Sequence, residues 1–225
     1  MINLATVLSV RTASKRLPAK ALLTFDNRPL IKFIYQRVKV NRLGGRFILA
    51  TTTNKSDDYL SSIFKSESID VFRGSTNDLV KRHIDLSEKY KLDFIIRITG
   101  DCPFIDGRTL DYCLGQVDNF EKFDIFTTKG IFPIGIDFEL INCRTLKDNW
   151  KYMNEEDKEH LTYYFYREEN KKRFRIFNFT LPKDWQNSKN SFTIDTLDDY
   201  LRALKLYDNF GKSNIPVKDL LSIDY

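Results

Sequence analysis

A cluster of positive side chains follows the first apolar run of the sequence. Residues 4–10 read LATVLSV, and Arg11, Lys15, Arg16 and Lys20 come within the next ten positions. Because Pro18 lies among them, these cations cannot occupy the interior of an ordinary helix. A buried strand that opens into a loop of converging positive charge is a common way to hold phosphates at the carboxyl end of a parallel sheet. The alternative is an exposed basic loop, since Lys and Arg are common on surfaces.

Two acidic residues follow predicted strands in distant parts of the chain. Asp101 comes after the apolar run at 93–99, with Gly100 before it and Pro103 after it, and Asp195 lies near the end of a short predicted strand at 191–196. A carboxylate at a strand end is well placed to bind Mg²⁺, which takes one or two carboxylates plus substrate phosphates. A helix-capping role is the alternative for Asp101.

The cationic segment carries a family resemblance. Residues 11–20 read R-T-A-S-K-R-L-P-A-K, which resembles the signature R-x-x-S-x-R-L-P-x-K of the cytidylyltransferases that activate acidic sugars. These CMP-sugar synthetases include the acylneuraminate and 3-deoxy-manno-octulosonate cytidylyltransferases. The chain also resembles the branch of spore coat polysaccharide biosynthesis protein F. The family often has Gly where this chain has Ala13 and Ala19. Because Gly allows the closest backbone approach to a phosphate, we expect the loop to sit slightly differently here.

The resemblance implies a site for CTP and Mg²⁺. The segment R-x-T-G-D-x-P around Asp101 resembles the family's metal-binding segment, and Asp195 resembles its second metal-binding Asp, so the two would complete one Mg²⁺ site. The residues implied to be catalytic are Arg11, Lys20 and Asp101. Those implied to bind the nucleotide are Arg11, Ser14, Arg16, Lys20, Arg73, Gly74, Arg97, Thr99 and Gly100.

The run F-R-G-x-x-x-D-x-x-x-R at 72–82 resembles a wall of the family's nucleotide site. Base and ribose contacts are implied for Arg73 and Gly74. Asp78 and Arg82 are four residues apart and share a face of the predicted helix at 79–90, so pairing with each other is the alternative for them.

Two further segments resemble the spore coat branch and would face the acceptor. One is P-x-G-x-D-x-E, with Gly135, Asp137 and Glu139, and the other is E-H-x-T, with His160. A histidine there could hydrogen-bond or act as a base near neutral pH. A packed structural role beside Tyr163 is the alternative for His160.

Strand and helix patterns alternate through the first half of the chain, which is typical of a parallel α/β sheet. Strands are predicted at 4–10, 46–53, 69–72, 93–99, 124–128, 173–181 and 191–196, and helices at 30–43, 54–64, 79–90, 108–117, 143–150, 155–169 and 197–207. In the last of these helices Leu197, Leu201 and Leu204 form the expected apolar face. The resemblance implies a three-layer α/β/α nucleotidyltransferase (GT-A-like) fold with a mostly parallel sheet. We expect one domain over 1–225, with a small extra lobe at 130–170 that serves the acceptor or a homodimer.

Composition narrows the function. The formal charge of +5 in 225 residues suits a small anionic substrate, and the absence of a basic tail argues against a nucleic-acid partner. The three cysteines form no C-x-x-C pair, which argues against zinc and disulfides and indicates a reducing compartment. No apolar run reaches transmembrane length and no signal peptide is evident, so we expect no membrane partner and a cytoplasmic location.

The reaction implied is transfer of CMP from CTP to an acidic sugar or a phosphorylated small molecule, with release of pyrophosphate, in surface polysaccharide biosynthesis. A nucleotide-sugar-using glycosyltransferase of related fold is one alternative. Such enzymes commonly carry Asp-x-Asp, which this sequence lacks. A non-catalytic nucleotide-binding protein is another alternative, although it would need no metal-binding carboxylates. Preference for another base, such as uracil, stays open.

Overall fold

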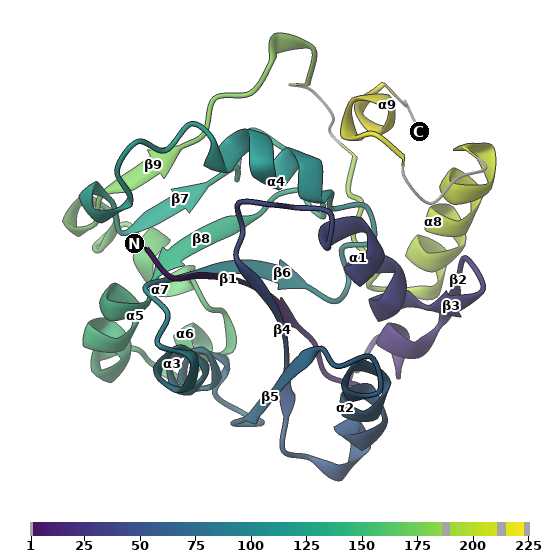
Figure 1. Cartoon of the computed structure of the whole chain (residues 1–225), viewed down its shortest axis with the longest axis horizontal. Helices are drawn as coiled ribbons and strands as arrows, with labels where there is room; N and C mark the ends of the chain where they lie inside the picture. The colour runs from purple at the N-terminus through teal and green to yellow at the C-terminus, as the bar shows by residue number, and fades with distance from the viewer. Residues whose placement is uncertain (1, 186–189, 211–214, 223–225) are drawn as a thin grey trace.

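The structure is a computed structural model that describes residues 2–185, 190–210 and 215–222. The described residues form a seven-stranded central sheet in the order β5-β4-β1-β6-β8-β7-β9 (Figure 1). All neighbouring strands run parallel except β8, which is antiparallel to both β6 and β7. The strands are β1 (Leu4–Ser9), β4 (Arg46–Thr52), β5 (Asp70–Gly74), β6 (Phe94–Thr99), β7 (Ile125–Thr127), β8 (Glu139–Asn142) and β9 (Ile176–Asn178). The predicted mostly parallel sheet is confirmed.

Helices cover both faces of this sheet, which gives the predicted three layers (Figure 1). One face carries α1 (Leu30–Val38), α2 (Asp58–Lys65), α4 (Gly107–Leu114), α8 (Leu197–Phe210) and α9 (Val217–Leu221). The other carries α3 (Leu79–Tyr90), α5 (Cys143–Asn149), α6 (Glu155–Glu159) and α7 (Tyr163–Tyr166). Below, these are called the α8 face and the α3 face of the sheet.

Alternation along the central strands feeds two hydrophobic cores. On β1, Ala5 and Val7 pack into the core of the α3 face, whereas Leu8 packs into the core of the α8 face. On β6, Ile95 and Ile96 divide in the same way. Each fully buried Val, Leu or Ile side chain contributes about 1.5–3 kcal/mol relative to an exposed one. Because a shift of one residue would exchange the two faces, the double burial fixes the strand register.

The segment at 130–170 adds β8 to the sheet and α5, α6 and α7 to the layer beside α3. Its aromatic residues Tyr164 and Phe165 are buried in the core of the α3 face. Core packing therefore accounts for them. The predicted helix at 155–169 is interrupted, because α6 ends at Glu159 and His160 adopts an extended backbone.

Two expectations for the C-terminal third are wrong. Residues 191–196 do not form a strand; their backbone makes isolated bonds, from Phe192 N to Ile134 O (2.8 Å) and from Ile194 N to Asp101 O (2.9 Å). On α8 the buried residues are Ala203 and Leu206, whereas Leu197 and Leu201 are exposed. The helical period was right, and Leu204 packs, partly buried, against the core of the α8 face as predicted. Leu197 and Leu201 of the predicted face do not.

A short hairpin of β2 (Thr24–Phe25) and β3 (Arg28–Pro29) was not predicted. Its turn residues Asp26 and Asn27 have φ of 52° and 57°, which Asp and Asn tolerate better than most residues. The Tyr207 hydroxyl donates to the Asp26 carboxylate, so the hairpin is tied to α8.

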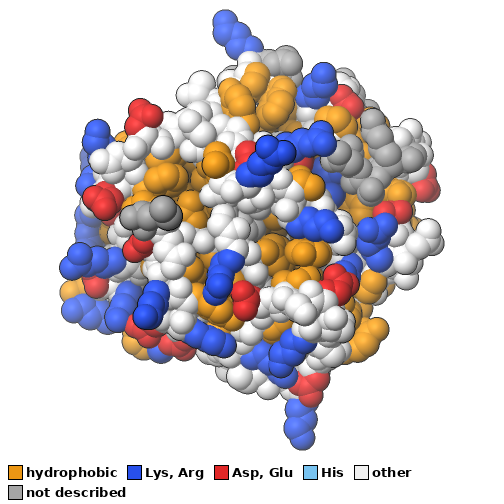
Figure 2. All heavy atoms as spheres, viewed as in Figure 1, with side chains coloured by type: hydrophobic (Ala, Val, Ile, Leu, Met, Phe, Trp, Pro, Cys, Tyr) orange, Lys and Arg blue, Asp and Glu red, His pale blue; other side chains and the backbone are white. Residues whose placement is uncertain are grey.

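The surface mixes charges of both signs. Figure 2 shows Lys and Arg side chains lying among Asp and Glu on the viewed face. No helix in the described part of the chain has both the length and the apolar character needed to cross a membrane. The three cysteines are buried and unbonded.

Ala13 and Ala19 of the cationic loop differ in backbone conformation, and this difference can be tested. Ala19 lies in the left-handed region (φ 54°, ψ 24°), whereas Ala13 has no positive φ. Ala19→Gly should raise the free energy of unfolding by about 0.5–1 kcal/mol, because relief of the left-handed strain exceeds the entropy that Gly adds to the unfolded chain.

Ala13→Gly is the matched control and should leave that free energy unchanged or lower it. Urea denaturation of both variants measures the effect. Equal changes in the two variants would contradict the assignment of strain to Ala19.

Candidate functional site

A cleft of about 620 Å³ opens at the carboxyl ends of β1 and β6. This edge is the usual ligand position in open parallel sheets. The residues that line it are Ser9, Val10, Arg11, Ala13, Ser14, Lys15, Arg16, Lys20, Thr76, Asn77, Leu79, Arg82, Thr99, Gly100, Asp101, Glu159, His160 and Asp195. Five of them are Lys or Arg from the loop after β1 or from α3, so the cleft favours an anionic ligand.

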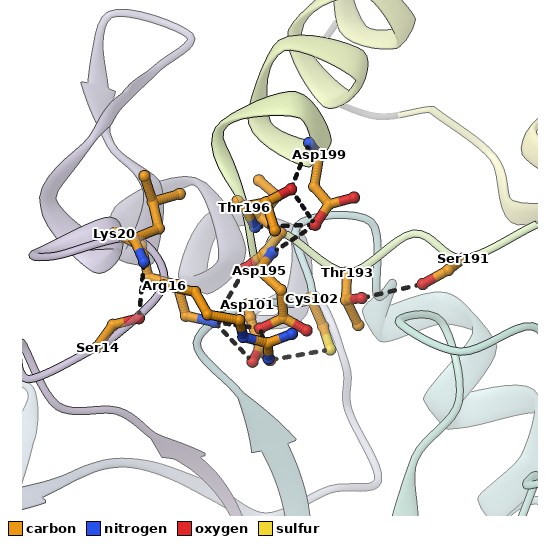
Figure 3. A network of polar contacts seen from close by, with 12 residues as sticks. Ser14, Arg16, Lys20, Asp101, Cys102, Ser191, Thr193, Asp195, Thr196 and Asp199 are labelled. Carbon is orange, nitrogen blue, oxygen red and sulfur yellow. Dashed lines mark hydrogen bonds and ion pairs between the residues drawn. The ribbon is translucent and has the colours of Figure 1, made fainter.

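Lys20 sits between the two acidic residues of this cleft. Its Nζ lies 3.0 Å from Asp101 Oδ2 and 2.9 Å from Asp195 Oδ1, and it also donates to the Ile194 carbonyl at 2.9 Å. Arg16 Nη2 lies 3.0 Å from the same Asp195 oxygen. Figure 3 shows Arg16 and Lys20 reaching from the loop toward Asp101, after β6, and Asp195, before α8.

Charge balance within the cluster keeps these groups ionised. Burial lowers the pKa of Lys20, but Asp101 and Asp195 raise it more, so its net pKa lies above the usual value. Burial raises the pKa of Asp101, and the Lys20 charge together with hydrogen bonds from Thr99, Lys20 and Cys102 outweighs it, so the net shift is downward. At neutral pH the Lys20 ammonium therefore faces the Asp101 carboxylate as an ion pair.

The backbone brings the two carboxylates together. The bond from Ile194 N to Asp101 O fixes the segment before α8 against the end of β6, and Gly100 N donates to Ser9 O at 3.1 Å. A Cβ on Gly100 would lie 2.6 Å from Val10 Cγ2, so this close approach of the β1 and β6 ends requires glycine. The segment around Asp101, which was predicted to bind metal, is thus bonded both to the end of β1 and to the segment before α8.

Asp199 fixes the orientation of Asp195. Its Oδ2 accepts hydrogen bonds from the Asp195 and Thr196 amides at 3.1 and 2.9 Å, and its Oδ1 pairs with Arg202 at 2.7 Å. Burial raises the pKa of Asp199, but the bonds from Thr196, Asp195 and Arg202 lower it to about 2. Asp199 therefore caps α8 as an anion and holds the turn that presents Asp195.

The acid pair fits a metal ion that a ligand completes. Within the described residues, no three His, Cys, Asp or Glu side chains gather to hold a metal by themselves. Asp101 and Asp195 do gather around one cation, the Lys20 ammonium. Because Mg²⁺ commonly takes one or two carboxylates and fills its other positions with phosphate and water, this donor set suits a metal shared with a bound phosphate.

A buried carboxylate anchors the cationic loop. Asp57, 1 % exposed at the start of α2, accepts hydrogen bonds from the Thr12 amide (2.8 Å) and hydroxyl (2.6 Å) and from the Thr52 hydroxyl. The loop closes on itself through Ala19 N and Thr12 O at 3.1 Å. The cations thus project from a loop held at its base. Asp57 falls inside the helix predicted at 54–64, and this anchoring role was not predicted from the sequence.

Arg82, the last residue of the run at 72–82 that resembles a wall of the nucleotide site, lines the cleft. It does not form the expected ion pair with Asp78, because Asp78 caps α3 and accepts from Trp150 Nε1 at 2.9 Å. Arg82 Nε donates to Ser75 O at 2.8 Å. Burial, followed by repulsion from Arg11, lowers its pKa to about 10, so Arg82 remains a cation in the cleft at neutral pH.

Comparison with known families decides the identity of the chain. The family described as cytidylyltransferase matches residues 5–218. The chain belongs to the cytidylyltransferase family. It is therefore a CTP-dependent nucleotidyltransferase, and the resemblance noted in the cationic loop is confirmed.

Individual relatives agree with this assignment of the cytidylyltransferase. The spore coat polysaccharide biosynthesis protein SpsF of Bacillus subtilis is 27% identical over 99% of this chain and 94% of its own length. A cytidylyltransferase structure from Leptospira borgpetersenii superposes with a TM-score of 0.89 at 29% identity, over 98% of this chain and 92% of that one. CMP:2-keto-3-deoxy-manno-octonic acid synthetase complexed with CTP shares the fold (TM-score 0.70, 15% identity, 92% and 99% of the two chains).

The cleft of the cytidylyltransferase brings together many of the predicted site residues. Those that line it are Arg11, Ser14, Arg16, Lys20, Thr99, Gly100, Asp101, His160 and Asp195. Those that do not are Arg73, Gly74, Arg97, Gly135, Asp137 and Glu139. Ligand roles for the second group remain predictions, and each of these residues has protein contacts of its own.

Arg73 and Arg97 bind protein groups beside the cleft. The Arg73 guanidinium donates to the Thr52 and Asn54 carbonyls and pairs with Asp58 at 2.6 Å, so it braces the loop after β4. Arg97 Nη1 lies 3.4 Å from the buried Glu139 carboxylate.

Three of the predicted acceptor residues, Gly135, Asp137 and Glu139, make contacts outside the cleft lining. Glu139, 1 % exposed, pairs with Lys129 at 2.9 Å and accepts from Thr162 at 2.7 Å. Gly135 (φ 94°) packs so closely on the segment before Asp195 that a Cβ there would lie 2.6 Å from Thr193 N. Asp137 accepts from Gly135 N at 2.9 Å, which stabilises this turn.

Asp57→Asn tests the anchor of the loop. The amide would place a donor against the Thr12 and Thr52 donors, and we expect a loss of about 1–3 kcal/mol in the free energy of unfolding at pH 7. Burial raises the pKa of Asp57 and the threonine bonds lower it more, so the folded pKa is below the usual value. The wild-type advantage should thus be complete above about pH 5 and decline as pH falls through the folded pKa.

Asp58→Asn is the control, because the Asp58 carboxylate is exposed and pairs with Arg73 at the surface. Its effect should stay below about 1 kcal/mol. Thermal or urea unfolding across pH 3–7 measures both variants. A wild-type advantage over Asp57→Asn that grows in acid would overturn the anchor assignment.

Proposed function

We propose that this cytidylyltransferase transfers CMP from CTP to a small anionic acceptor, a sugar acid or a phosphorylated compound, and releases pyrophosphate. The observation that supports this is the cluster of Asp101 and Asp195 around the Lys20 ammonium, inside a cleft lined by four further cations. The match to SpsF along nearly its whole length supports a place in polysaccharide biosynthesis.

In the proposed reaction an oxygen of the acceptor attacks the α-phosphorus of CTP. The new phosphorus–oxygen bond forms as the bond to the bridging oxygen breaks, and pyrophosphate leaves with that electron pair. The proton of an acceptor hydroxyl passes to solvent or to a nearby base. Such a displacement depends on positioning and charge neutralisation rather than on a covalent intermediate.

The cationic loop supplies the neutralisation. Arg11, Arg16 and Lys20 would contact the triphosphate, and the anchor at Asp57 would keep the loop in place while they do. Asp101 and Asp195 would hold Mg²⁺, which when bound polarises the phosphoryl oxygens and neutralises charge on the leaving group. Glu159 and His160 lie exposed at the rim of the cleft, where the acceptor would enter.

Asp101→Asn tests the metal role. Loss of one carboxylate should reduce Mg²⁺-dependent pyrophosphate release at least about 10²-fold while leaving the fold intact. Asp198→Asn is the matched control, since Asp198 is exposed on α8 and does not line the cleft. Wild-type turnover in Asp101→Asn would remove this residue from the proposed site.

Lys20→Ala tests the nucleotide role. Removal of the charge should weaken CTP binding at least about tenfold, since a hydrogen bond to a charged group is worth about 1.5–3 kcal/mol. Melting of the wild type with CTP, UTP, ATP and GTP, each with and without Mg²⁺, identifies the donor, because a ligand at a hundred times its Kd adds about 2.7 kcal/mol. No shift with any nucleotide would overturn the proposed function in favour of a non-catalytic role.

The setting of the enzyme is part of the proposal. Three free, buried thiols fit a reducing compartment, so we place the enzyme in the cytoplasm. Ile134, Tyr152 and Tyr163 expose 66%, 60% and 45% of their surface in the 130–170 segment, and we propose that this segment supports a homodimer. Sedimentation as a monomer at micromolar concentration would refute the dimer.

A further inference from the structure

A serine at the floor of the cleft is bonded to a fully buried histidine. Ser9 is the last residue of β1, lines the cleft and is 8 % exposed. Its Oγ lies 2.7 Å from Nε2 of His83, which is on α3 and 0 % exposed. Nothing in the proposed reaction uses either side chain.

The partners of the His83 ring settle which atom carries each proton. Nδ1 lies 2.8 Å from the Leu79 carbonyl oxygen, which can only accept, so Nδ1 bears the hydrogen. Burial lowers the pKa of His83 to about 3, with Arg82 and Arg97 adding to the shift and the Leu79 bond opposing it. The ring is neutral at pH 7, Nε2 is bare, and the Ser9 hydroxyl must donate to it.

Ser9 therefore presents only lone pairs to the cleft. A ligand N–H or O–H group can donate to them. A ligand carbonyl or phosphate oxygen cannot, because both oxygens carry negative partial charge and repel each other. An ordinary serine would rotate its hydroxyl to suit either kind of group. His83 removes that freedom.

The position of Ser9 separates it from the ionic cluster. Its side chain turns toward α3, on the same face of β1 as Val7, whereas Asp195 arrives on the segment that leads into α8. Leu79, on α3, also lines the cleft and offers apolar surface on the same side as Ser9, and Val10 lines the cleft from the α8 side. Apolar walls with one directional acceptor suit a nucleobase better than a phosphate chain.

We propose that Ser9, held as an acceptor by His83, selects cytosine over uracil by accepting a hydrogen bond from the 4-amino group of the base. This rests on the proposed function, in which the cleft binds CTP. Uracil carries an oxygen at the same position, and this oxygen would be repelled by the Ser9 oxygen instead of donating a hydrogen bond to it. His83 is a positioning residue that acts through Ser9.

Two substitutions should reduce the preference for CTP over UTP, one by weakening CTP binding and the other by strengthening UTP binding. Ser9→Ala removes the acceptor, so CTP should bind about tenfold more weakly while UTP changes little. His83→Phe fills the ring site and frees the Ser9 hydroxyl to donate, so UTP should bind more tightly and the preference should fall by about tenfold. Ser87→Ala is the control, because Ser87 is buried on α3, bonds Ile84 O and lies outside the cleft lining.

The experiment measures Kd calorimetrically, with Mg²⁺, for CTP, UTP and the triphosphate of pyrimidin-2-one riboside, which lacks the 4-amino group. The wild type should prefer CTP to both others by at least about tenfold, and Ser9→Ala should abolish the difference between CTP and the pyrimidinone. This ligand comparison decides the matter even if His83→Phe fails to fold.

Equal affinity of the wild type for CTP and the pyrimidinone would overturn the inference and leave the proposed transferase standing. An undiminished preference in Ser9→Ala, or a loss of preference in Ser87→Ala, would overturn it as well. A wild type that binds none of the triphosphates would instead remove the proposed function, on which the inference depends.

Discussion

Asp101 and Asp195 lie in one cleft with the Lys20 ammonium between them, and the arrangement of the site depends on this contact. At 4 Å and an effective dielectric constant of about 20, two unit charges interact with about 4 kcal/mol. Two acidic side chains brought this close to one point repel each other unless a positive charge lies between them. The Lys20 ammonium lies about 3 Å from an oxygen of each, and its charge holds the pKa of Asp101 below the usual value.

The same contact explains why three remote parts of the fold are fixed so firmly. Lys20 reaches the pair only because its loop is tied to Asp57 at one end and closed by Ala19 at the other. Asp195 is presented by a turn whose amides are bonded to Asp199. Asp101 follows a β6 end that lies against β1 without an intervening Cβ at Gly100. Each of these contacts helps to keep the Lys20 ammonium within hydrogen-bond distance of the two acidic side chains.

Ala19 shows how the cationic loop keeps this geometry without a glycine at that position. Ala19 adopts the left-handed backbone that a glycine would take up at no steric cost. Strain of this kind persists where surrounding bonds over-determine the conformation. Here those bonds are the loop closure to Thr12 and the hold on Lys20 by its two acidic partners.

Local pattern and motif gave the layers, the parallel sheet and the residues of the acid pair. Strands such as 93–99 could be predicted because they are buried on both faces and read as apolar runs. The face of α8 could not, because the choice between Leu201 and Ala203 depends on where the helix axis lies above the sheet. Ser9 and His83 escaped notice for a similar reason. Neither belongs to a motif, and their bond depends on how closely α3 packs on β1.

The bond between Lys20 and Asp195 joins residues 175 positions apart, and the one to Asp101 spans 81. Closing such distances costs chain entropy before any contact is gained, and folds rich in distant contacts form slowly. A chain emerging from the ribosome can complete β1, β4, β5 and β6 long before residue 195 exists. Until then the cluster around Lys20 contains Asp101 but not Asp195. The cluster around Lys20 is therefore completed late in synthesis, when the segment that carries Asp195 packs against the end of β6.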